Sequence, residues 1–226
     1  MTESLDQLIR GMKWPVALGV AAMTPAAAWG LWLQIEALSG DPSRGFPAWT
    51  GFGLYLGLWL VFFRRPRWGS LFSTFEHELT HAIFALGTLH RVRGMGLSWR
   101  SGGHLTISGE LHWLILAAPY FFPTVSVLVL AALALLPGAG GPVGASLLGA
   151  SLAYHFTSNW HQTRVAQSDL RRVGIAFAAL FLPGANLLAC GALLACYQGD
   201  TEGLVSFARF VGEASVEILG PLGGGL

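Results

Sequence analysis

Long apolar stretches divide this sequence and limit what the chain can fold into. They cover residues 14–38, 49–63, 113–136, 143–160 and 173–197. A helix needs about 20 mainly apolar residues to cross a lipid bilayer, and most of these stretches approach or exceed that length. Charged residues make up only 11% of the chain, against about 25% in soluble domains. We therefore expect lipid to cover much of the protein's surface.

The predicted fold is mainly α: a polytopic membrane protein with about five to six membrane helices and one β-hairpin. A short amphipathic helix is expected over residues 3–12, before the first span, and a turn-rich loop over residues 39–48. Pro119 and Pro123 should bend the span that begins near Trp113, because proline cannot donate the helical hydrogen bond. A helical tail is expected over residues 201–219.

A short polar helix and the hairpin lie between the second and third apolar stretches. Ser73 and Glu76 match a capping box, which predicts that the helix opens near Ser73. Gly87 is a plausible end for it. Residues 91–112 alternate short apolar runs around Ser101-Gly102-Gly103, the pattern of two strands joined by a glycine-rich turn.

The basic clusters at residues 64–67 and 164–172 both favour the cytoplasmic side of the membrane. Three complete crossings between them would place them on opposite sides. One of the intervening elements is therefore expected not to span, and the helix at 73–87 with its hairpin is the candidate for a partly re-entrant unit.

Net charge and cysteine content exclude two classes of protein. The formal charge is +1, so the sequence offers no basic surface for nucleic acid. The two cysteines, Cys190 and Cys196, lie in one apolar stretch, where packing rather than a disulfide framework is expected.

The run His77-Glu78-Leu79-Thr80-His81 carries the clearest chemistry in the chain. Histidines at i and i+4 lie on one face of a helix, where two neutral imidazoles can bind one Zn²⁺. Glu78 is turned away by about 100°, which suits it to reach a zinc-activated water as general base rather than to ligate the metal.

A simpler interpretation of the same five residues is a pair of core histidines bonded to backbone carbonyls, with Glu78 paired to an arginine. The apolar setting argues against it, because ionisable groups within membrane segments are costly and usually functional. Zinc is therefore the expected cofactor.

This motif, on a membrane helix followed by a Gly-Gly-containing hairpin, resembles the site-2 protease family of intramembrane zinc metalloproteases (peptidase family M50, M50B-like). The resemblance extends over residues 70–190. It implies cleavage of transmembrane or membrane-associated proteins, a third zinc ligand that is an aspartate from a later helix, and a hairpin edge that pairs with extended substrate.

The third ligand is less plainly marked. The family's usual Asn-Pro…Asp-Gly type of motif is absent, and Gln167-Ser168-Asp169-Leu170 is the nearest match. Asp169 is also the only acid between Glu110 and Asp200. His161 and His155 are the alternative third ligands. If Asp169 is not a ligand, it would instead form an ion pair with a nearby arginine.

Several neighbours of the motif are weaker candidates. Asn159 and His161 could line the site, with Asn159 able to hydrogen-bond the tetrahedral intermediate. Gly102 and Gly103 could lie near the substrate. His90, His104 and His112 flank the hairpin, and such lone histidines are usually surface or core residues.

The sequence thus favours a membrane-embedded zinc metalloendopeptidase with Glu78 as catalytic residue and His77, His81 and Asp169 as metal ligands. The alternatives are a membrane metallohydrolase acting on lipids or small amides, and a catalytically degenerate scaffold of the same fold. The expected partners are a membrane-protein substrate, the lipid bilayer and a regulatory membrane partner.

Three segments are expected along the chain: residues 1–68 with the amphipathic helix and two spans, residues 69–198 as the metalloprotease core, and residues 199–226 as a tail. Glu3 and Asp6 occupy the place where a signal peptide would be basic, so the first span is expected to stay. The expected location is a bacterial cell (inner) membrane.

Overall fold

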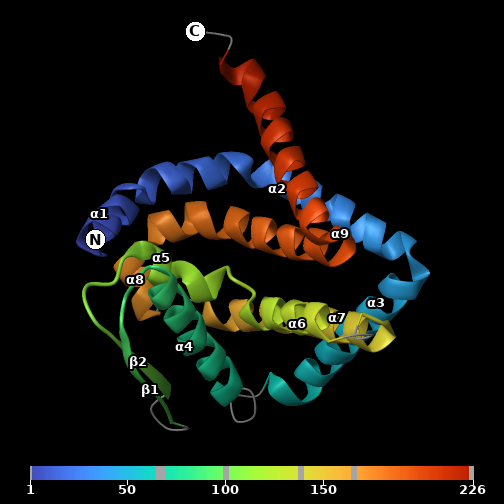
Figure 1. Cartoon of the computed structure of the whole chain (residues 1–226), viewed down its shortest axis with the longest axis horizontal. Coiled ribbons are helices and arrows are strands. Elements are labelled where there is room, and N and C mark those ends of the chain that lie inside the picture. Colours follow the sequence, from blue (N-terminus) through green and yellow to red (C-terminus); the bar gives the residue numbers. More distant parts are fainter. Residues whose placement is uncertain (1, 65–69, 99–101, 137–139, 164–166, 224–226) are drawn as a thin grey trace.

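A computed structural model describes residues 2–64, 70–98, 102–136, 140–163 and 167–223 of the chain. Within them the protein is mainly helical with one two-stranded sheet (Figure 1). The elements are α1 (Thr2–Gly11), α2 (Lys13–Gly40), α3 (Pro42–Leu58), the π-helix η1 (Trp59–Phe63), α4 (Ser70–Gly87), β1 (Val92–Ser98), β2 (Gly102–Ile107), α5 (Trp113–Ala117), the 3₁₀ helix η2 (Ala118–Tyr120), α6 (Thr124–Leu135), α7 (Pro142–Gln162), α8 (Ser168–Val173) and α9 (Ile175–Gly223).

Three helical segments of the described residues are long and apolar enough to cross a membrane: Lys13–Gly40, Pro42–Phe63 and Ile175–Ile218. The count rises to four if Trp113–Tyr120 and Thr124–Leu135, bent by 78°, form one span. The expected five to six spans are not confirmed. The difference lies mainly in α7, whose second half carries serine, histidine, asparagine and glutamine side chains.

The bend between α5 and α6 falls where prolines were expected to cause it. Pro119 is the second residue of the 3₁₀ helix η2, and Pro123 precedes the first residue of α6. Proline has no amide hydrogen for a helical bond, so the helix cannot continue through this segment. The expected bend at Pro119 and Pro123 is confirmed.

Two helix pairs form most of the body of the molecule. Figure 1 shows α2 running beside the first half of α9, and α3 crosses close to α7. Small residues at the crossings permit this approach. A Cβ added to Gly184 of α9 would lie 2.7 Å from the Val20 carbonyl oxygen, and one added to Gly51 of α3 would overlap the backbone of Ser146.

The long helix α9 is kinked where the last span was expected to end. Gly199 and Asp200 have non-helical backbone angles, with φ of +52° at Asp200. Beyond the kink, Phe207 and Val211 pack against Ala26 and Ala195 in a small core. The predicted helical tail is thus confirmed, while the predicted division of the chain at residues 68 and 198 stays a prediction.

Two local predictions are wrong. Residues 39–48 do not form a loop, because Asp41 alone separates α2 from α3. Its carboxylate accepts a hydrogen bond from the Ser43 amide at 2.9 Å, and Pro42 occupies the first helical position, a strong helix-start combination. The helix α4 also begins earlier than expected, at Ser70, so Ser73 lies inside the helix and not at its start.

The hairpin is confirmed. Strands β1 and β2 pair in antiparallel register from Val92↔Ile107 to Ser98↔Gly102, with an irregularity between Val92 and Gly94. Of the expected glycine-rich turn, Gly102 and Gly103 belong to β2, and Ser101 lies outside the described residues. Parts of the basic clusters at 64–67 and 164–172 also lie outside them.

Candidate metal centre

His77 and His81 present the same ring nitrogen to one point beside α4. They lie one turn apart on the helix, and their Nε2 atoms are 3.1 Å from each other. Their rings meet edge to face with centroids 4.7 Å apart. Both side chains are largely shielded, at 14% and 9% exposed. The local i, i+4 spacing thus brings two potential ligand atoms together.

Asp169 reaches the same point from the short helix α8. Its Oδ2 lies 3.4 Å from Nε2 of His77 and 3.4 Å from Nε2 of His81. His77, His81 and Asp169 form one of two groups among the described residues whose donor atoms lie close enough to hold a metal ion. Two ligand atoms about 2.1 Å from a tetrahedral zinc ion are about 3.4 Å apart, so the three atoms fit zinc in type and spacing.

The other ring nitrogen of each histidine is held by an acceptor. Nδ1 of His77 lies 2.7 Å from Oε1 of Gln162 at the end of α7, and Nδ1 of His81 lies 2.7 Å from the carbonyl oxygen of Ile115 in α5. Nδ1 therefore donates its hydrogen, and the Nε2 lone pair faces Asp169. Outer hydrogen bonds of this kind fix the tautomer of metal-binding histidines.

Neither outer acceptor was predicted. Gln162 is 85 residues from His77, and the Ile115 contact uses a backbone atom that carries no sequence signal. Polarity at the end of an otherwise apolar helix was the one available signal for Gln162.

Asp169 has a further polar neighbour in Tyr120, whose hydroxyl donates to Oδ2 at 3.4 Å. Burial raises the pKa of the Asp169 carboxyl, but the proximity of the His77 and His81 rings lowers it, and the net effect holds that pKa well below its usual value. The aspartate is therefore ionised, as a metal ligand must be.

Glu78 lies under strand β2. A Cβ added to Gly103 would come within 2.7 Å of Glu78 Cγ and of Thr74 Cγ2, and within 2.9 Å of Glu78 Oε1. Glycine at 103 is thus required for the hairpin to approach α4 this closely. His104 belongs to the opposite side of the strand, where its ring covers Gly96.

Glu76 is a buried side chain rather than a helix cap. It is 5% exposed, and the hydroxyl of Tyr154 donates to its Oε2 at 3.4 Å. Thr80 bonds to its backbone oxygen at 2.8 Å. The expected capping role is wrong, because α4 begins six residues before Glu76 and the carboxylate turns toward α7 instead.

The other residues considered from sequence lie elsewhere. Asn159 donates to Asn186 Oδ1 at 2.8 Å, and His155 lies 3.1 Å from the same oxygen, so both belong to a polar contact between α7 and α9. The ring of His161 is 5.5 Å from that of Trp59. Among the described residues, the third member of the histidine group is Asp169 and neither of the alternative histidines.

Residues 52–139 of the chain match a protein-family model. That model is described as Peptidase M50B-like. The resemblance to the M50, or site-2 protease, family is confirmed. No curated protein and no solved structure matches the chain.

The M50B-like segment contains α4, the hairpin, α5 and α6, and with them His77, Glu78 and His81. It ends before α7 and α8, so Asp169 and Gln162 lie outside it. Their relation to the histidines comes from the three-dimensional structure alone.

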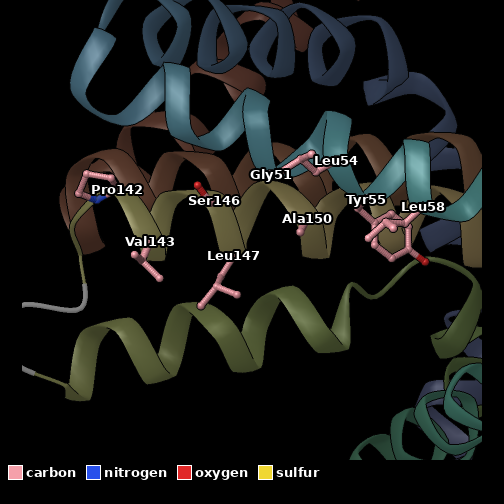
Figure 2. Close-up of a pocket in the computed structure, with 9 residues that line it drawn as sticks. All are labelled: Gly51, Leu54, Tyr55, Leu58, Pro142, Val143, Ser146, Leu147 and Ala150. Carbon is pink, nitrogen blue, oxygen red and sulfur yellow. The ribbon is translucent and has the colours of Figure 1, made fainter.

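An open groove between α3 and α7 lies away from the histidines. Figure 2 shows its lining side chains, which are mainly apolar: Gly51, Leu54, Tyr55, Leu58, Pro142, Val143, Ser146, Leu147 and Ala150. This set includes no acid, histidine or cysteine, so the groove lacks the ligands and the carboxylate base that metal-dependent hydrolysis needs.

Proposed function

We propose that this protein is a membrane-embedded zinc endopeptidase that cleaves transmembrane or membrane-associated proteins. The observation that carries the proposal is the approach of His77 Nε2, His81 Nε2 and Asp169 Oδ2 to within 3.1–3.4 Å of one another. Two imidazoles and one carboxylate form a common catalytic zinc set, and three protein ligands leave one position open.

The outer contacts support the same assignment. Gln162 and the Ile115 carbonyl hold the two histidines with Nε2 directed at Asp169. Histidines bonded to carbonyls in an ordinary core do not call for an ionised aspartate facing both remaining nitrogens, because a buried charge is costly unless a cation lies close to it. A divalent cation supplies that compensation.

Glu78 is the proposed general base and proton carrier. When bound, zinc would act as a Lewis acid toward the scissile carbonyl and lower the pKa of the attacking water. The Glu78 carboxylate would take a proton from that water and later deliver it to the leaving amine nitrogen. Its place on the same helix as both histidines, yet turned from their face, suits this role.

The hairpin supports an extended peptide as substrate. Strand β2 passes close to Glu78 at Gly103, where the absence of a side chain permits the approach. A two-stranded sheet leaves an unpaired edge on each strand, and an extended segment can add to such an edge through its backbone. A transmembrane helix must unwind locally before it can bind in this way.

Zinc content and cleavage, measured together in detergent-purified protein, test this function. The wild type and the control Glu202→Ala, which removes an exposed acid of α9, should hold zinc and cleave a membrane-spanning model substrate. Asp169→Ala should lose both. Zinc and cleavage retained in Asp169→Ala would refute the ligand assignment. Zinc-dependent hydrolysis of lipid, with no cleavage of membrane peptides, would refute the protease.

A further inference from the structure

A second group of metal-binding side chains lies where α1 meets the rest of the protein. Asp6 comes from α1, His90 from the link between α4 and β1, and His112 from the position that caps α5. Asp6 Oδ2 is 3.5 Å from His90 Nε2, and Asp6 Oδ1 is 4.0 Å from His112 Nε2. All three donor atoms lie within 4.8 Å of one another.

These atoms are buried and lack hydrogen bonds. The side chains of His90 and His112 are 2% and 0% exposed. Asp6 Oδ1, His90 Nε2 and His112 Nε2 have no hydrogen-bond partner. Polar atoms left unpaired in a protein interior are costly and rare, and here three of them face one point from three separate elements. A bound cation would satisfy all three at once.

We propose that Asp6, His90 and His112 form a second zinc site that fastens the N-terminal helix α1 to the protein. Imidazole and carboxylate donors suit zinc among the common divalent ions. The spacings of 3.5 and 4.0 Å need only a small closure to reach the roughly 3.4 Å of tetrahedral ligands. This site shares no residue with the group at His77.

The contacts of Nδ1 in His90 and His112 show how zinc binding would change the tautomer of each ring. Nδ1 of His90 lies 3.2 Å from the carbonyl oxygen of Thr88, so it donates there and leaves the Nε2 lone pair for a metal. Nδ1 of His112 faces the Ile115 amide at 3.4 Å, at the long limit of a hydrogen bond. Ligation through Nε2 moves the proton of His112 to Nδ1, so that weak contact is lost on binding.

The surrounding contacts fit a fastening role. Arg10 of α1 forms an exposed ion pair with Glu110 at 2.7 Å, and Trp113 donates to the Ile9 carbonyl oxygen. Exposed ion pairs add little stability, whereas a metal that joins three elements fixes them together. His112 immediately precedes α5, and the Ile115 carbonyl of α5 holds His81. Zinc bound at His112 therefore also fixes the start of the helix that supports the first group.

Zinc stoichiometry tests the proposal. The full chain is purified in detergent, equilibrated with zinc, freed of loosely bound metal by gel filtration and analysed by plasma mass spectrometry. We expect two zinc ions per wild-type chain and one in Asp6→Asn. The matched control Glu3→Gln removes an exposed acid from the same helix and should keep two. His77→Ala/His81→Ala should keep one, and adding Asp6→Asn to that variant should leave none.

A second measurement does not depend on the first group. In the His77→Ala/His81→Ala variant, cobalt should give a visible absorption band that Asp6→Asn abolishes, and zinc should slow amide hydrogen exchange in residues 5–11. One zinc per wild-type chain, with Asp6→Asn unchanged in stoichiometry, would overturn the second site and leave the proposed protease intact. A loss of zinc in His77→Ala/His81→Ala but not in Asp6→Asn would likewise overturn the second site.

Discussion

The side-chain oxygen of Gln162 lies 2.7 Å from Nδ1 of His77 and so directs the other ring nitrogen of His77 at Asp169. The amide of Gln162 is itself fixed, because its Nε2 donates to Ser158 Oγ at 2.8 Å and to the Ser73 carbonyl oxygen at 3.4 Å. The end of α7 thereby controls the orientation of a histidine on α4.

Gln162→Leu should weaken zinc binding by about 10- to 100-fold, the usual cost of losing an outer hydrogen bond to a metal-binding histidine. Excess zinc should restore cleavage, because Glu78 and the three proposed ligands stay in place. Competition with a chelator measures the affinity. Gln198→Leu, which removes a glutamine that bonds to Gln34 in the α2–α9 pair, is the control. Equal zinc affinity in both variants would contradict the role of Gln162.

Gly103→Ala should reduce cleavage while zinc content stays unchanged. The added Cβ would lie 2.7 Å from Glu78 Cγ and Thr74 Cγ2, so either the base or the hairpin must move. A displacement of about 1 Å near reacting groups can cost about 100-fold in rate. Gly94→Ala on β1, where an added Cβ has nothing within 4 Å, should cleave normally. Similar rates in the two variants would contradict the contact between β2 and Glu78.

Substrates with a helix-breaking residue near the cut should be cleaved faster than uniformly helical ones. An extended segment is needed to pair with the edge of β1 or β2, and unwinding a transmembrane helix exposes its backbone groups. Two model spans that differ only in a glycine–proline pair measure this effect by their cleavage rates. Indistinguishable rates would count against strand pairing as the binding mode.

Gly51→Ala should destabilise the pair formed by α3 and α7 without touching the histidines. The new methyl group would overlap the backbone of Ser146, and overpacking of this kind costs about 1–3 kcal/mol. Thermal unfolding in detergent should show a lower midpoint than for Gly53→Ala, where an added Cβ meets nothing within 4 Å. A midpoint unchanged by Gly51→Ala would mean that the two helices can separate freely.

Features set by neighbouring residues could be predicted from the sequence. The spacing of His77 and His81 places both on one helix face, and Pro119 and Pro123 mark the bend that the structure contains. The hairpin followed from alternation around glycines. The predicted start of α4 at Ser73 was wrong because the helix continues three residues further toward its N-terminus, to Ser70.

Features that depend on tertiary contacts could not be predicted. Resemblance and scarcity point to Asp169, but its 3.4 Å approach to the histidines depends on how α8 packs against α5. Gln162 and the Ile115 carbonyl have no motif. His90 and His112 looked like lone histidines, because Asp6 meets them only after α1 folds back on the segment before α5.

Zinc content and cleavage, compared between the wild type and Glu78→Gln, test most directly whether Glu78 is the general base of a zinc protease. Glutamine keeps the size of glutamate but cannot accept a proton, and Glu78 is not a member of the group formed by His77, His81 and Asp169. We expect unchanged zinc content and a loss of cleavage to the background level. Cleavage at the wild-type rate, with zinc bound, would contradict it.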